Sequence, residues 1–469
     1  MPKSNIINQK NKRWVILGSV VLLILIIVII GKLTGCSDRG ENAISSGKVD
    51  LTPTNELVLD IPGYRWFPEI YKKAMDEFRK QYPNVKLTIN RLGDKENYPT
   101  DQYQTALTNE LMAGSGPDVV LIDYFMSDLY KTMDTGSFLD LSSIIKGDKD
   151  FNMEDYNTSI MDGGNYKGGQ YIMPLGYSAQ ILVTDQSGLD SIGFDKTKVT
   201  DSTSLFREIS KCVPKAEENQ YFSRMTDKPI LTSSFYSSGI SLVDENNKKI
   251  LPDKEEFRAF CEAYQPFYKT DNNKDKPYSG TIYDMYSQGI LPFGYTNANS
   301  LWIIYWGYIK SKGGNPVILA PKSVNGGLCA TITNGVAIRS GSTNQLNAWN
   351  FIKILLSAPI QGMDVNSDGF GYPVNREGIK SHLQKYKKLD KSGITNDGEE
   401  SELVDLTFLT DKDIEEFQTV LNGFSGSTLR CKPLDNLFTK CMEPYFKGEK
   451  ELDSCMDNLG RQLDLYITE

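Results

Sequence analysis

The chain has 469 residues and a formal net charge of −9, so it is long enough for two domains and is acidic rather than basic. An acidic chain lacks the positive surface that phosphate binding requires, which argues against nucleic acid as a partner. It holds one histidine and no CxxC pair, so a histidine-based triad or a zinc site has almost nothing to build on. We therefore expect no metal and no cofactor.

The first 35 residues indicate an export signal. A basic start is followed by an uncharged run from Trp14 to Ile30 and then by Leu33-Thr-Gly-Cys36. This tetrapeptide resembles the lipobox of bacterial lipoproteins, which implies cleavage before Cys36 and a lipid such as palmitate on it. The alternative is an uncleaved transmembrane anchor, because 17 uncharged residues just suffice to span a bilayer and Lys32 is unusual so near a lipobox.

In both interpretations the basic start stays inside and the rest of the chain lies on the outer face of the cell membrane. Removal of residues 1–35 takes away five positive charges and no acidic residue, which moves the net charge to −14. The polar stretch that follows Cys36, up to residue 54, predicts a flexible tether between the lipid and the folded domain.

From residue 55 onward, apolar runs and helical patterns alternate. Strands are predicted at 56–60, 85–89 and 118–123, with helices between them at 70–82 and 103–111. This order predicts a parallel sheet with helices on its faces, that is, an α/β fold.

The remaining two thirds of the chain continue the mixed pattern. Extended runs at 171–184 and 316–321 are predicted to cross between domains, and a further strand is predicted at 334–338. Helices are predicted at 253–269, 302–309, 344–357, 434–445 and 452–466.

A series of segments in fixed order resembles the extracellular solute-binding lipoproteins of carbohydrate ABC importers, the maltose-binding-like group. The segments after the lipobox include FRKQYPNVKLTI, LMAGSGPDVVLI, GGQYIMPLGYSAQILVTD, GILPFGYTNANSLW, GNPVILAPK, AWNFIKILLSAPIQ and GYPVNREG. They cover nearly the whole mature chain. No segment is specific alone, but AGSGPDV and AWNFIKILLS in this order are fairly specific together.

The resemblance implies a periplasmic-binding-protein-like fold, in which a hinge of crossing strands joins two α/β lobes and the ligand lies in the cleft. It places the crossings near 172–180, 318–325 and 424–434. One lobe is then expected at 55–172 plus 325–425, and the other at 175–320 plus 430–469. The implied function is capture of a sugar or oligosaccharide and its delivery to the membrane permease of an ABC importer, without catalysis.

A sugar site needs aromatic platforms for the ring faces and polar groups for the hydroxyls, placed at the carboxyl ends of strands. The residues predicted to bind ligand on these grounds are Arg65, Trp66, Asp123, Tyr124, Tyr177, Tyr295, Asn297, Trp302, Asn334 and Tyr372.

Packing competes with binding for several of these positions. Trp66 is the strongest candidate because it follows a strand directly, in a loop bounded by prolines. Asn334 precedes a glycine, so a turn is its alternative role. Trp349 lies on the apolar stripe of its helix and is predicted to be core, and Trp306 is predicted to pack more than to bind.

Three smaller features have two interpretations each. Residues 364–369 match the first half of a calcium loop, but the twelfth position is Asn375 instead of Glu, which favours a polar turn. Cys441 and Cys455 lie on two successive helices, so a disulfide between them is open. His382 lies in a polar stretch and is predicted to be a solvated surface residue.

Other functions stay open at this point. A secreted glycan hydrolase needs two positioned carboxylates, and the number of acidic residues, 60, does not decide whether two are so placed. A binding subunit that reports to a sensor, or a binding protein for a polyamine, peptide or anion, would keep the fold and change the partner or the ligand.

Overall fold

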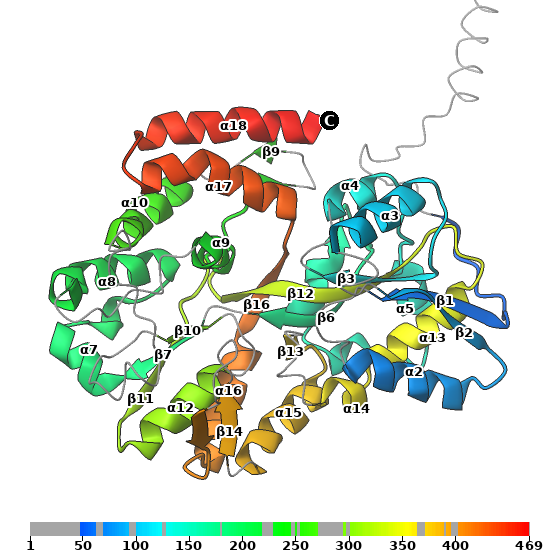
Figure 1. Ribbon diagram of the computed structural model, residues 1–469, viewed down its shortest axis with the longest axis horizontal. Coiled ribbons are helices and arrows are strands. Elements are labelled where there is room, and N and C mark those ends of the chain that lie inside the picture. The colour runs from blue at the N-terminus through cyan, green and yellow to red at the C-terminus, as the bar shows by residue number, and fades with distance from the viewer. Residues whose placement is uncertain are drawn as a thin grey trace, which may run out of the picture. The chain divides into compact units, whose positions relative to one another are not determined.

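Apolar runs separated by glycine and proline fold into the strands of one large sheet (Figure 1). The computed structural model describes residues 47–61, 69–92, 100–123, 128–178, 181–217, 228–244, 249–250, 254–270, 294–296, 301–363, 371–388, 391–394 and 402–468. No helix among the described residues has both the length and the apolar character of a membrane span.

The large sheet has the strand order β13-β6-β12-β3-β1-β2, with β16 also paired to β12. The β1–β2, β1–β3 and β12–β16 pairs are parallel, as predicted for the first three strands, and the others are antiparallel. The strands are β1 (Glu56–Ile61), β2 (Lys86–Leu92), β3 (Val119–Asp123), β6 (Met173–Ser178), β12 (Leu328–Ile338), β13 (Tyr372–Pro373) and β16 (Phe424–Leu429).

A second, antiparallel sheet has the order β10-β7-β11. The predicted extended run at 171–184 divides between the two sheets, because its first half forms β6 and its second half forms β7. The second sheet consists of β7 (Ile181–Asp185), β10 (Gly294–Thr296) and β11 (Pro316–Leu319). Three two-stranded pairs are β4 (Asn165–Tyr166) with β5 (Gly169–Gln170), β8 (Val243–Asp244) with β9 (Lys249–Ile250), and β14 (Lys391–Ile394) with β15 (Glu402–Asp405).

Helices flank the large sheet and make up most of the rest of the described chain. In Figure 1, α2 and α13 lie on one side of the β1–β3 region and α3 and α4 on the other. The helices are α2 (Glu69–Gln81), α3 (Thr100–Met112), α4 (Leu129–Asp134), α5 (Ser142–Gly147), α6 (Thr158–Met161), α7 (Gln186–Ile192), α8 (Ser202–Glu217), α9 (Lys228–Ser237), α10 (Lys254–Thr270), α12 (Leu301–Ser311), α13 (Gln345–Leu356), α14 (Ala358–Gln361), α15 (Arg376–Lys388), α16 (Asp411–Asn422), α17 (Lys432–Phe446) and α18 (Leu452–Thr468), with short 3-10 turns at Met153–Asp155, Asp162–Gly164 and Lys196–Lys198.

The buried apolar side chains form two clusters. The first cluster joins the large sheet to helices such as α2 and α13, where the rings of Phe78 and Phe351 meet edge to face at 5.8 Å. The second cluster joins α7 to α10 with α17 and α18, where Phe235 stacks on Phe438 at 4.7 Å. Each cluster is therefore a separate hydrophobic core within the described residues.

Two tryptophans predicted to pack are confirmed as core residues. Trp349 is 1% exposed and meets Phe151 edge to face at 5.0 Å. Trp306 is buried as well, and its Nε1 donates a hydrogen bond of 2.8 Å to Asp413 of α16. Both rings combine a large apolar surface with a satisfied N–H, as buried tryptophans usually do.

The predictions for His382 and for the cysteine pair need correction. His382 is buried on α15 because it shares one helix face with Ile379 and Tyr386, and its ring meets Tyr386 at 5.3 Å. The prediction of a surface histidine was therefore wrong. Cys441 and Cys455 are both buried free thiols, so the disulfide left open by the sequence is not formed.

Candidate functional site

The large sheet brings four of the predicted residues onto neighbouring strands. Asp123 at the end of β3 pairs with Asn334 of β12, which pairs on its other side with Gly176 of β6. The next residue, Tyr177, pairs with Tyr372 of β13. Residues in register lie side by side across a sheet, so Asp123, Asn334 and Gly176 form one row, and Tyr177 and Tyr372 belong to the next row. We call these five positions together the sheet row. It includes the carboxyl end of β3, and α/β folds bind ligands at such strand ends.

The two tyrosines of the sheet row are buried. Tyr177 is 0% exposed, and its ring centroid lies 5.6 Å from that of Tyr372, which is 2% exposed. Phe424 of β16 adds a third ring, 5.3 Å from Tyr177. Burial raises the pKa of both tyrosines. The two rings pack the first core, and a role in ligand contact stays a prediction for them.

The other predicted residues are placed by their backbone or lie outside the described part of the chain. Tyr295 is in β10 opposite Leu182 of β7, and Trp302 is in the first turn of α12. Asn334 is half-buried. Outside the described residues lie Arg65, Trp66, Tyr124, Asn297 and the lipidation candidate Cys36. As ligand contacts, all of them stay predictions.

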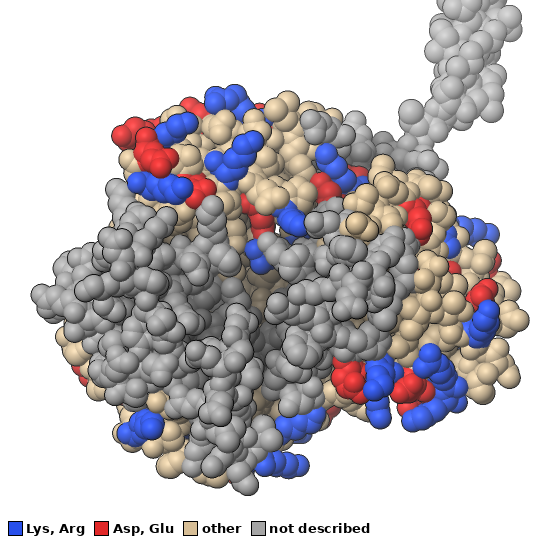
Figure 2. Space-filling model, in the orientation of Figure 1, with Lys and Arg blue, Asp and Glu red and all other residues tan. Residues whose placement is uncertain are grey.

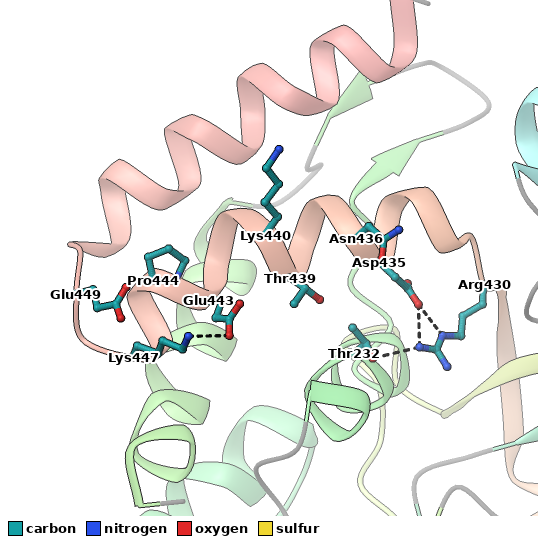
Figure 3. A pocket seen from close by; sticks show the side chains of 10 residues that line it. All are labelled: Thr232, Arg430, Asp435, Asn436, Thr439, Lys440, Glu443, Pro444, Lys447 and Glu449. Carbon is teal, nitrogen blue, oxygen red and sulfur yellow. Dashed lines mark hydrogen bonds and ion pairs between the residues drawn. The ribbon is translucent and has the colours of Figure 1, made fainter. Parts of the chain in front are cut away.

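A polar groove of about 700 Å³ runs along helix α17 (Figure 3). It forms because Leu434, Phe438 and Met442 turn the apolar face of α17 into the second core and leave its polar face outside. We call it the α17 groove. Its lining residues are Thr232, Arg430, Asp435, Asn436, Thr439, Lys440, Glu443, Pro444, Lys447 and Glu449.

One end of the α17 groove is a buried ion pair. The Arg430 Nε and Nη2 atoms donate to one oxygen of Asp435 at 2.9 and 2.7 Å, and Nη2 also reaches the Thr232 hydroxyl at 3.2 Å. The Tyr236 hydroxyl donates to the other Asp435 oxygen. Burial and the nearby Asp435 raise the pKa of Tyr236, so it stays a donor. These contacts fix the guanidinium in place.

Towards the other end, the groove is more open. Glu443 accepts from Lys447 Nζ at 3.0 Å and from the Tyr268 hydroxyl at 3.2 Å. The hydrogen bond to Glu443 raises the pKa of Lys447. Apart from Pro444, the lining side chains that make no hydrogen bond or ion pair with the described residues are Asn436, Thr439, Lys440 and Glu449. Thr439 and Lys440 follow Asn436 by three and four residues, so each is a neighbour of Asn436 on the helix surface.

The groove is electrically balanced. Three basic side chains face three acidic ones, and Figure 2 shows both signs interspersed over the α17 and α18 surface. Donors and acceptors therefore alternate without a net field, which suits an uncharged ligand with many hydroxyl groups better than an anion or a cation. None of the ten described lining residues is aromatic, so a ring platform would have to come from elsewhere.

The described residues contain no group of three His, Cys, Asp or Glu side chains that could hold a metal ion. The calcium-like motif at 364–369 lies outside them.

Residues 64–362, more than half of the chain, match the family described as bacterial extracellular solute-binding protein. The chain belongs to this family. Membership of this family gives a periplasmic or extracellular location for this solute-binding protein. No curated protein matches its sequence.

Solved structures with the same fold span nearly the whole solute-binding protein. The sugar-binding protein MalE from Xanthomonas citri has a TM-score of 0.60 at 13% identity, covering 88% of this chain and 97% of its own. A periplasmic oligogalacturonide binding protein from Yersinia enterocolitica has 0.55 at 14%, with 88% and 99% covered. An ABC substrate-binding protein from Listeria monocytogenes, in complex with cycloalternan, has 0.52 at 15%, with 88% and 99% covered. These matches confirm the predicted two-lobed α/β fold.

The α17 groove of this solute-binding protein was not predicted from the sequence. The helix was predicted from its apolar stripe, and no role was assigned to its polar face. Asn436 and Thr439 were detectable only as uncharged polar residues in a helix otherwise rich in charge. Thr232, which lines the groove from α9, lies about 200 residues earlier in the chain, and no local pattern predicts that approach.

Proposed function

We propose that this solute-binding protein captures a sugar or oligosaccharide outside the cell and delivers it to the permease subunits of an ABC importer. The balanced, hydroxyl-compatible chemistry of the α17 groove on a solute-binding fold carries the proposal. Support comes from proteins of the same fold that are described as sugar-binding, as oligogalacturonide-binding and as being in complex with cycloalternan.

The proposed site combines the sheet row, which includes the carboxyl end of β3, with the α17 groove. In this arrangement the groove supplies hydrogen bonds to hydroxyl groups. The proposed aromatic and polar contacts elsewhere are Arg65, Trp66, Asp123, Tyr124, Tyr177, Tyr295, Asn297, Trp302, Asn334 and Tyr372. Closure of two lobes over the sugar would stabilise the bound state through contacts that only the closed form makes.

The lobe boundaries at 55–172 plus 325–425 and at 175–320 plus 430–469 are part of the proposal. The two hydrophobic cores support them, because most members of each core fall in one proposed lobe. Helix α12 departs from this division. It lies within the second proposed lobe, yet Ile303 and Trp306 belong to the first core.

The proposal also includes the membrane anchor. Cleavage before Cys36 and a lipid on that residue would hold the protein near its permease at a high effective concentration. The mass of the mature protein tests this directly, with a lipid-modified Cys36 at the N-terminus as the expected result.

We propose that the protein binds without catalysis, as a member of a binding-protein family. The alternative of an enzyme has one observation in its favour, since a de novo designed esterase has the same fold with a TM-score of 0.55. Chromatography of a sugar incubated with the pure protein separates the two, because a binding protein returns the sugar unaltered.

The deciding experiment is calorimetry with a panel of maltotriose, cellotriose, xylotriose, trigalacturonate, spermidine and a tripeptide. We expect saturable binding of at least one sugar and of neither spermidine nor the peptide. At a hundredfold excess over Kd, the sugar should add about 2.7 kcal/mol to the free energy of unfolding. Binding of only a non-sugar would overturn the proposed ligand class.

A variant of Thr439 tests whether the sugar binds in the groove. Thr439→Val removes one hydroxyl and should weaken sugar binding roughly threefold to tenfold, the value of one hydrogen bond. Thr419→Val is the matched control, because Thr419 is an exposed helical threonine of α16 whose hydroxyl bonds only its own helix. Equal affinities of the two variants would remove the groove from the site.

A further inference from the structure

Asp128 is the point where three helices meet. Its Oδ1 caps the N-terminus of α4 by accepting from the Lys131 backbone N–H at 3.1 Å. The same oxygen accepts from the hydroxyl of Tyr466, on α18, at 3.0 Å. The thiol of Cys431, the N-cap residue of α17, lies 3.7 Å from this oxygen and 3.6 Å from the Tyr466 hydroxyl. We call these four residues the Asp128 junction.

Further contacts join the same elements. The Lys131 ammonium lies 5.2 Å from the centre of the Tyr466 ring, within cation–π range. The Tyr130 hydroxyl donates a hydrogen bond of 3.2 Å to the backbone carbonyl of Leu429, which is the last residue of β16. Tyr130 also packs against both hydrophobic cores. Helix α4, whose Leu129 belongs to the first core, is thus tied to helices of the second core by side-chain hydrogen bonds.

The protonation states suit this arrangement. Burial, together with the nearby Asp128 carboxylate, raises the pKa of the Cys431 thiol and of the Tyr466 hydroxyl. Both groups therefore keep their protons at neutral pH and can donate towards Asp128. A hydrogen bond to a carboxylate is stronger than one between neutral groups, so Asp128 is a firm acceptor.

The junction lies, along the chain, beside both parts of the proposed site. Asp128 follows the Asp123 end of the sheet row by five residues. Cys431 directly follows Arg430, which closes one end of the α17 groove. A residue that ties α4 to α17 and α18 therefore sets the placement of one part of the site relative to the other.

We propose that Tyr466 is a positioning residue for ligand binding, which acts through Asp128 to hold the sheet row and the α17 groove in the arrangement that receives one ligand. This inference rests on the proposed function. A ligand that needs both parts binds only the fraction of molecules in which they are correctly placed, and its apparent affinity falls with that fraction.

The test is Tyr466→Phe, which removes the hydroxyl and keeps the ring beside Lys131. Calorimetry uses whichever panel sugar the wild type binds most tightly, and affinity should fall about threefold to tenfold, as expected for loss of one hydrogen bond. Tyr445→Phe is the matched control. Tyr445 is buried on α17, and its hydroxyl makes no hydrogen bond with the described residues, so its loss should leave affinity unchanged. Wild-type affinity in Tyr466→Phe would overturn the proposal.

A second measurement separates this inference from the proposed function. Amide hydrogen exchange over 128–134, without ligand, should be faster in Tyr466→Phe than in the wild type and unchanged in Tyr445→Phe. Equal exchange in all three proteins would overturn the junction. If the wild type bound no sugar of the panel, the proposed ligand class would fall, and exchange would still decide whether Tyr466 holds α4.

Discussion

One ion pair between a lysine and a carboxylate lies beside the large sheet, and another lies in the α17 groove. Beside the sheet, Asp148 accepts from Lys353 at 2.8 Å and from Trp349 Nε1 at 2.7 Å, with only 16% of its side chain exposed. In the groove, Glu443 accepts from Lys447 at 3.0 Å, with 19% of the Glu443 side chain and 42% of the Lys447 side chain exposed. The two carboxylates are therefore similarly buried, but the lysine of the groove is more exposed than Lys353, which is 24% exposed.

This difference indicates where ligand contacts should be sought in this protein. The Tyr177 ring of the sheet row is packed against other rings, and the Asp148 carboxylate is hydrogen-bonded, so changing these groups should alter stability first. Groups in the α17 groove are only partly paired, so changing them should alter binding first. The three predictions below test this division, and each can break it.

The largest effect is expected for Tyr177→Ala in the sheet row. The substitution removes a fully buried ring that packs on Tyr372 and Phe424, and it leaves a cavity. Large-to-small changes of buried aromatic residues cost about 3–5 kcal/mol. Urea denaturation should show a loss of this size in the free energy of unfolding.

Tyr177→Phe is the control for this prediction. The Tyr177 hydroxyl is buried and has no hydrogen-bond partner in the described part of the chain. Its removal should leave stability unchanged or slightly higher, because no bond is lost. If sugar affinity fell in this stable variant, the Tyr177 hydroxyl would contact the ligand, and the division between sheet and groove would fail there.

An intermediate effect is expected for Asp148→Asn. Burial alone would raise the pKa of this carboxyl, but hydrogen bonds from Lys353 and Trp349 outweigh it and hold the pKa below the usual 3.8. A lowered folded-state pKa adds stability above about pH 4, and this stability is lost as the pH falls through the folded value. The variant should lose about 1 kcal/mol at pH 7, allowing for solvent screening.

Measurement of the free energy of unfolding as a function of pH checks this prediction for Asp148. Between about pH 4 and pH 2, the wild type should lose stability more steeply than the variant, so the two curves converge. Parallel curves would show that Asp148 is no better stabilised in the folded protein than in the unfolded chain.

The sequence predicted the fold well where local pattern and tertiary role coincide. The first three strands are apolar runs between clear breakers, and they pair in parallel as expected. Helix α13 was predicted within one or two residues because its apolar stripe is strong. In contrast, β12 begins at Leu328, six residues before the predicted strand. Its early part is fixed by pairing with β16, which lies far along the chain.

The candidate site was harder to predict, for a physical reason. An aromatic residue near a strand end looks the same in sequence whether it faces a ligand or, like Tyr177, another ring. His382 was misjudged because charged neighbours hid its place on the apolar face of α15. The α17 groove depends on Thr232 approaching a distant helix, which is information that only the folded chain contains.

The smallest effect is expected for Lys447→Ala, at the rim of the groove. An exposed ion pair contributes little to stability because solvent screens it, so the melting temperature should not change measurably. Lys353→Ala, its matched counterpart beside the sheet, should lower it, since Asp148 would lose a donor in a mostly buried setting. Loss of Lys447 also leaves the groove with one excess negative charge, so trigalacturonate should bind more weakly while neutral maltotriose is unaffected. Calorimetry with both sugars and thermal unfolding of both variants test this contrast. If Lys447→Ala destabilised the protein as much as Lys353→Ala, the groove would be packed like the sheet, and its polar groups would not be available to a ligand.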